Sequence, residues 1–187
     1  MRILISLTLC LMLCACGVEP EDRSFVTAIS VNSEGVTLLT AEGSVKDENE
    51  EKNQGIITGK GDTVAKAVKD CALKSSGRLF FGHTAVCIID SELAGSKSAL
   101  IDLAKYMAEE TEVSRRVVLL QAENTEKIMN AEDKNIGDFV KKYYKAHRDY
   151  KPVELDSLCK ALAESESLTI PTLKYENEAF IIQTDDN

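Results

Sequence analysis

The segment that most constrains the fold is residues 55–90, GIITGKGDTVAKAVKDCALKSSGRLFFGHTAVCIID. A short apolar run is broken by glycines, and Asp62 or Thr63 can then cap a helix whose apolar residues recur at spacings of three and four. Two more apolar, partly β-branched runs follow, with Gly82 and His83 between them. Because a helix with one apolar face must cover another layer, the segment predicts a strand, a helix and two strand segments of one sheet.

Neighbouring patterns extend this sheet. Alternation over residues 25–32 puts every second side chain on one face. Asn-Ser-Glu-Gly at residues 32–35, between this run and the next extended run, predicts a hairpin with a loop of moderate length. Residues 96–121 repeat the order of helix and strand. A later helix from residue 133 has one apolar stripe and a basic C-terminal part: Lys141, Lys142, Lys145 and Arg148. We expect the α+β class, with a mixed β-sheet packed by amphipathic helices and opening with a β-hairpin.

The N-terminus is typical of an export signal. Arg2 precedes an apolar run over residues 3–13, which is too short to span a membrane comfortably. Residues 13–16, Leu-Cys-Ala-Cys, resemble a bacterial lipobox, in which cleavage follows a small residue and the next thiol takes the lipid. We therefore expect cleavage between Ala15 and Cys16 and lipidation of Cys16. An ordinary cleaved signal with an incidental cysteine is the alternative.

Charge and cysteine content narrow the class of partner. The formal net charge is −9, and loss of Arg2 with the signal makes it −10, which argues against nucleic acid and against adhesion of the whole chain to anionic headgroups. Cys71, Cys87 and Cys159 remain in the folded part without a metal-like spacing, so we expect no metal and no cofactor. Buried free thiols are favoured, while a disulfide between Cys71 and Cys87 stays open.

Candidate reaction centres are weak. The glycines of residues 55–63 do not have the spacing of a phosphate-binding loop; a helix N-terminus there could hold an anion, but a turn with positive φ explains the glycines more simply. His83 and His147 lie in apolar patterns and are expected to be structural. The acidic residues at the ends of predicted elements are expected to be solvated: Asp90, Glu92, Glu109, Glu110 and Glu112. The chain is therefore expected not to be an enzyme.

Several of these segments together resemble a known family. They are the lipobox, the early strand 27–32, residues 115–129, and a pattern of glycine, helix and strand residues: Gly59, Gly61, Ala67, Arg78, Leu79, Phe80, Gly82 and His83. This combination is similar to the Ger(x)C lipoproteins, the C subunits of the germinant receptors of endospore-forming bacteria. The motif residues Gly59, Gly61, Arg78, Phe80, Gly82 and His83 are expected to be structural.

The resemblance implies a membrane-anchored, non-enzymatic lipoprotein subunit needed for nutrient-triggered spore germination. Its implied partners are membrane lipid, through Cys16, and the membrane-embedded A and B receptor subunits, on the extracytoplasmic face of the spore inner membrane. The expected organisation is a signal peptide (1–15), a lipidated tether (16–24), an N-terminal α+β domain (25–170) and an extension resembling the start of a middle domain (171–187). An exported solute-binding or cell-wall-binding lipoprotein is the alternative, and an exported enzyme ranks last.

Overall fold

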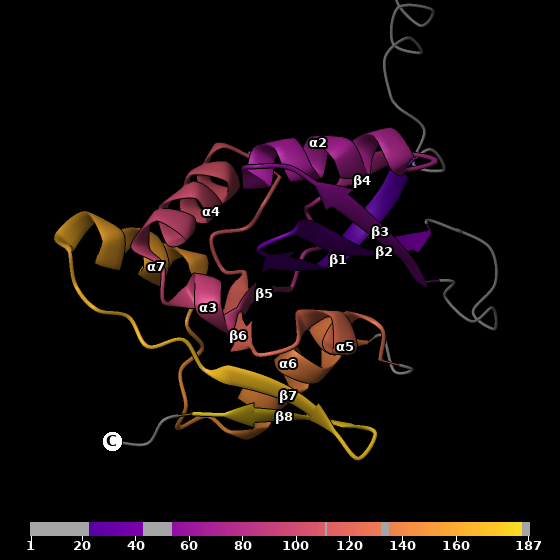
Figure 1. The fold of residues 1–187 in the computed structure, drawn as a ribbon. Coiled ribbons are helices and arrows are strands. Elements are labelled where there is room, and N and C mark those ends of the chain that lie inside the picture. The colour runs from indigo at the N-terminus through magenta and orange to yellow at the C-terminus, as the bar shows by residue number, and fades with distance from the viewer. Residues whose placement is uncertain (1–22, 43–53, 111, 132–134, 185–187) are drawn as a thin grey trace, which may run out of the picture.

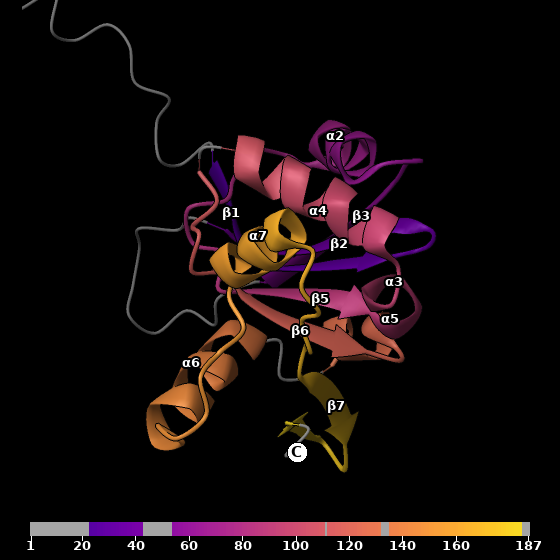
Figure 2. The same ribbon diagram turned by 90° about the vertical axis from the view of Figure 1, so that its left-hand side faces the viewer.

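An eight-stranded mixed sheet organises the chain, and helices cover both of its faces (Figure 1, Figure 2). The computed structural model describes residues 23–42, 54–110, 112–131 and 135–184. The predicted signal and most of the tether lie outside these residues. The strands are β1 (Arg23–Asn32), β2 (Gly35–Glu42), β3 (Gln54–Lys60), β4 (Arg78–Phe80), β5 (Val86–Asp90), β6 (Val118–Ala122), β7 (Thr172–Glu176) and β8 (Ala179–Gln183). The helices are α2 (Val64–Lys74), α3 (Ser91–Ala94), α4 (Lys97–Glu109), α5 (Thr125–Met129), α6 (Ile136–Ala146) and α7 (Leu155–Glu164).

The predicted opening hairpin is confirmed, but its loop is shorter than predicted, because only Ser33 and Glu34 lie between the paired residues. Strands β1 and β2 pair antiparallel, with Asn32 opposite Gly35. The Asn32 Oδ1 accepts hydrogen bonds from the backbone N–H groups of Glu34 and Gly35, both at 3.0 Å. Gly35 has a φ of 150°, and a residue with a side chain would be strained in this conformation. The polar asparagine and the glycine therefore set a tight turn.

A β-bulge at Thr27 changes which residues of β1 share a face. Val26 is opposite Thr40 and Ala28 is opposite Leu39, so Thr27 is the extra residue. As a result Val26 and Ile29 enter the same core, whereas Ala28 enters the core on the other face. The strict alternation predicted for this strand is therefore wrong across Thr27.

The strand-helix-strand reading of residues 55–90 is confirmed, and the sheet order is β3-β2-β1-β5-β6-β7-β8. Strands β4 and β5 pair in parallel with successive parts of β1, from Arg23 and from Ala28 onward. Since β1 to β3 form antiparallel pairs, β3 runs in the same direction as β5, with two strands between them. Helix α2 spans that separation. Strand β6 adds in parallel beside β5.

Two apolar cores lie on opposite faces of the sheet. One packs α2, α4 and α7 against the sheet, through residues such as Cys71, Leu103 and Leu158. The other packs α5, α6 and the β7–β8 hairpin, through residues such as Met129 and Val140. Both views show this division of the helices (Figure 1, Figure 2). The expected α+β class is confirmed.

Candidate functional site

An aromatic cluster marks the end of the sheet where β1 begins. It consists of Phe25, Phe80 and His83. The rings of His83 and Phe25 are stacked with centroids 5.0 Å apart, and Phe80 meets both of them edge-on, at 5.6 Å from Phe25 and 5.7 Å from His83. The Arg23 guanidinium lies over the Phe80 ring at 5.2 Å, in the geometry of a cation–π contact. The motif histidine is therefore held by ring packing.

The segment between β4 and β5 is shaped by Gly82 and Thr84. A Cβ on Gly82 would lie 2.7 Å from the Phe80 ring, so a side chain there would displace the ring. The buried Thr84 hydroxyl donates to the carbonyl of Val26 at 3.2 Å. These two contacts fix the turn, which presents His83 at the surface.

Glu112 supports the same turn from another part of the chain. Its carboxylate accepts from the backbone N–H of Phe81 at 3.3 Å and from the Arg78 guanidinium at 3.5 Å. Arg78 is largely exposed, so the ion pair itself contributes little, at most about 1 kcal/mol. The prediction that Glu112 is merely solvated is wrong. No local pattern signals a partner more than thirty residues away, and only the fold brings the two segments together.

An open cavity of about 590 Å³ adjoins His83. Its walls come from the segments that precede β5 and β6 and from the start of α6, and its charged residues are Arg116, Asp138 and Lys141. Within the described residues, the side chains of these three make no hydrogen bond or ion pair. The volume suits a small molecule, and both signs of charge are present.

The glycines Gly59 and Gly61 lie elsewhere, against α2. A Cβ on Gly59 would overlap the Ala67 carbonyl and would lie 2.6 Å from the Cys71 sulfur, and one on Gly61 would lie 2.6 Å from the Ala67 nitrogen. Neither glycine has a positive φ, so the explanation by a turn with positive φ is wrong. These residues are glycines because the helix backbone packs directly on the end of β3.

The start of α2, where the sequence left room for an anion, is filled by the protein itself. Thr63 caps the helix, its hydroxyl accepting from the Lys66 N–H at 3.3 Å. The Val64 N–H donates to the Asp102 carboxylate of α4 at 2.8 Å. A negative charge at a helix N-terminus is favourable, and here α4 supplies it. The open choice between Asp62 and Thr63 as the cap is thus decided for Thr63.

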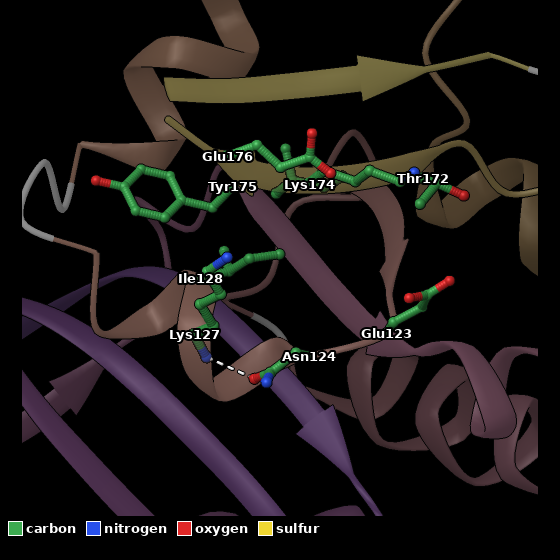
Figure 3. A pocket seen from close by; sticks show the side chains of 9 residues that line it. Glu123, Asn124, Lys127, Ile128, Thr172, Lys174, Tyr175 and Glu176 are labelled. Carbon is green, nitrogen blue, oxygen red and sulfur yellow. Dashed lines mark hydrogen bonds between the residues drawn. The ribbon is translucent and has the colours of Figure 1, made fainter. Parts of the chain in front are cut away.

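A second, smaller pocket of about 140 Å³ lies between α5 and β7 (Figure 3). It forms because β6 and β7 share a single ladder pair, Gln121 with Thr172, and then separate. Asn124 stands at its edge and caps α5, its Oδ1 accepting from the Lys127 N–H at 2.7 Å. This pocket follows from strand divergence and offers little enclosed space.

The family is shown by comparison with known proteins. A family described as "Spore germination protein N-terminal domain" matches residues 17–175. The chain belongs to this family. No curated protein and no solved structure matches it. The predicted resemblance to the N-terminal domain of the germination lipoproteins is thereby confirmed.

In this spore germination domain, the family-like motif residues divide between two places. Arg78, Phe80, Gly82 and His83 build the end of the sheet beside the open cavity, whereas Gly59 and Gly61 seat α2. The matched region begins directly after Cys16, and Ala15 and Cys16 lie outside the described residues. Among the residues that are described, no helix is long and apolar enough to cross a bilayer.

The three cysteines of the germination domain are free. The expectation of buried free thiols is confirmed for Cys71 and Cys87 but not for Cys159. Burial raises the pKa of Cys71 to about 11 and that of Cys87 to about 12. Cys159 is half-buried, and its sulfur accepts a long contact of 3.6 Å from the Arg115 guanidinium. In the part of the chain that the structure describes, no group of three or more His, Cys, Asp or Glu residues could hold a metal ion.

Proposed function

We propose that this chain is the lipid-anchored, extracytoplasmic subunit of a spore germinant receptor, held to the membrane through Cys16. It acts by assembling with membrane-embedded A and B subunits and carries out no chemistry of its own. The observation that carries the proposal is the match to the spore germination family over residues 17–175, which begins where the lipobox ends.

The anchor and the assembly role support each other physically. Two acyl chains on one residue are enough for lasting membrane attachment. Attachment confines the domain near membrane-embedded partners and raises its effective concentration there, so a modest interface is sufficient. His83, the residue of the motif best suited to acid–base chemistry, is packed against two phenylalanine rings, which fits a structural role.

Lipidation is tested by labelling cells with a fatty-acid probe. Cys16→Ala should abolish the label, whereas the matched variant Cys14→Ala should keep it, because only Cys16 directly follows the small Ala15. Unchanged labelling of Cys16→Ala would exclude this anchor.

Assembly is tested in spores. Spores that lack the chain should respond less to nutrients, and crosslinking from the anchored protein should recover the two membrane subunits. Normal germination together with no recovered receptor subunit would contradict the proposal.

One observation favours a second candidate, an exported solute-binding lipoprotein. The cavity beside His83 has the volume of a small-molecule site and carries Arg116, Asp138 and Lys141 on its walls. Under this alternative, a zwitterionic or anionic solute would raise the melting temperature of the isolated domain, and Arg116→Ala would remove that rise. The receptor proposal instead requires no such ligand, and the melting temperature of the isolated domain should not rise when the solute is added.

A further inference from the structure

Helix α6 and the segment after it are basic in an acidic protein. Described residues 135–151 contain five Lys or Arg residues and two Asp residues, a net charge of +3. Because the whole chain has a net charge of −9, all other residues together carry −12. The basic side chains are exposed: Lys141, Lys142, Lys145, Arg148 and Lys151. We call the first four of them the basic surface.

The position of α6 brings this charge to one end of the molecule. Near its start, a Cβ on Gly137 would lie 3.1 Å from Ala85 and 3.6 Å from the Thr27 carbonyl, so the helix begins against β1 and the segment before β5. From there α6 projects beyond the sheet, on the side where the chain enters β1 (Figure 2). Lys141 lines the same cavity as Arg116, which adds another cation at this end.

The charges of the basic surface are not used inside the domain. Within the described residues, none of its four side chains makes a hydrogen bond or an ion pair. Cations suit the C-terminal end of a helix, which accounts for Lys145 and Arg148. It does not account for Lys141 and Lys142, which lie in the middle of α6.

The apolar side of α6 leaves these cations facing outward. Ile136 and Val140 are buried in the core, and Tyr143 and Tyr144 are half-buried beside them. The Tyr143 ring stacks on His147 at 4.4 Å. Half-buried aromatic rings flanked by exposed lysines are a composition typical of helices at a membrane surface.

The anchor keeps this end of the sheet close to the bilayer. Six residues lie between Cys16 and Arg23, the first residue of β1, and even a fully extended chain over those seven steps reaches only about 25 Å. The end of the domain where β1 starts therefore cannot move far from the headgroups.

We propose that the basic surface of α6 lies against anionic phospholipid headgroups and sets the orientation of the anchored domain. The inference rests on the proposed membrane anchoring. The net negative charge disfavours adhesion of the domain as a whole, so the lipid supplies attachment and α6 selects which side faces the bilayer. The layer of α2, α4 and α7 then lies on the face of the sheet opposite α6, open to other proteins.

Lysine footprinting on vesicles tests the orientation. All residues of both cores lie between Val26 and Ile182, so a chain starting at Gly17 keeps the whole fold. Such a chain, held by an N-terminal histidine tag on chelating lipid, is treated with an amine-reactive reagent on vesicles with and without phosphatidylglycerol. Lys141, Lys142 and Lys145, and Lys151 in the same basic segment, should react about threefold more slowly on the anionic vesicles at low salt, and the difference should vanish at high salt.

A pair of charge-matched variants locates the effect, with Lys151 as the reporter lysine. Replacement of the basic surface by glutamine (K141Q, K142Q, K145Q and R148Q) should abolish the protection of Lys151. The control replaces four exposed lysines of α2, α4 and α7 (K69Q, K97Q, K105Q and K160Q) and should preserve it. Equal reactivity on both kinds of vesicle, or equal protection of Lys151 in both variants, would overturn the proposal.

The artificial tether separates this inference from the proposed function. If Cys16 is not lipidated in cells but footprinting shows the protection, the receptor proposal fails and the basic surface still binds anionic lipid. If Cys16 is lipidated and footprinting shows no protection, only the orientation is wrong.

Discussion

The Val64 backbone N–H donates to the Asp102 carboxylate at 2.8 Å and so joins the start of α2 to α4. Thirty-eight residues separate the two partners in the chain. The bond satisfies one of the free amides of the helix N-terminus and places a negative charge at the positive end of its dipole. It therefore stabilises both the helix and the packing of α2 beside α4.

Replacement of Asp102 should give a graded loss of stability. Asp102→Asn keeps an acceptor but removes the charge, and should cost about 0.5–1 kcal/mol of unfolding free energy. Asp102→Ala also leaves the amide unpaired and should cost about 2 kcal/mol. Urea denaturation measures both, with the exposed Glu109→Ala at the end of α4 as the control. Equal losses for Asn and Ala would show that the hydrogen bond is unimportant.

The stacking of His83 on Phe25 should appear as a coupling free energy. His83→Gln keeps a polar side chain but removes the ring, and Phe25→Ala removes the partner. A double-mutant cycle by chemical denaturation should give a coupling of about 0.5–1.5 kcal/mol. Additive losses of stability in the two single variants would mean that the two rings do not stabilise each other. If the His83→Gln variant stayed equally stable but lost a measurable catalytic activity, the structural role of His83 would be contradicted.

Gly59→Ala tests the close packing of β3 and α2. The new methyl group would meet the Ala67 carbonyl and the Cys71 sulfur, and we expect a loss of about 3 kcal/mol, or failure to fold at 37 °C. Gly95→Ala is the matched control, because its nearest contact would be an ordinary 3.6 Å, and its effect should stay within about 0.5 kcal/mol. Thermal melts of the two variants compare them directly. Similar melting temperatures would refute the packing explanation.

The thiols should differ in reactivity. With an aromatic disulfide reagent at pH 8, Cys159 should react in the folded protein, whereas Cys71 and Cys87 should react only after unfolding, because burial both blocks access and raises the pKa of each. Reaction of all three thiols at one rate would contradict the buried positions.

The same pKa shifts predict a loss of stability in alkali. The folded state favours the neutral thiols. Their contribution to the free energy of unfolding is therefore fully present below the pKa of a cysteine in the unfolded chain, about 8.5. It is lost as the pH rises toward about 11 for Cys71 and about 12 for Cys87. Denaturation midpoints measured from pH 8 upward should fall for the wild type and fall less for Cys87→Ala. Equal slopes would exclude a contribution from Cys87.

Local sequence determined much of this protein. The alternation and turn residues around Asn32 and Gly35 give the hairpin, and the spacing of Val64, Val68 and Cys71 gives α2 with its buried face. Side chains near a helix start produce their own caps, as Asn124 does for α5. These features follow from the sequence because each depends on contacts within a few residues of the chain.

Only the tertiary structure decided what depends on distant partners. The bulge at Thr27, seen in the register of β1 with β2, moves Val26 to the same face as Ile29. The carboxylates of Glu112 and Asp102 accept hydrogen bonds from the backbone N–H groups of Phe81 and Val64. These partners are more than thirty positions apart, and a pattern that repeats every two, three or four residues cannot predict them. Periodicity reports which side of an element is apolar, whereas the identity of the opposing group depends on how the layers close on each other.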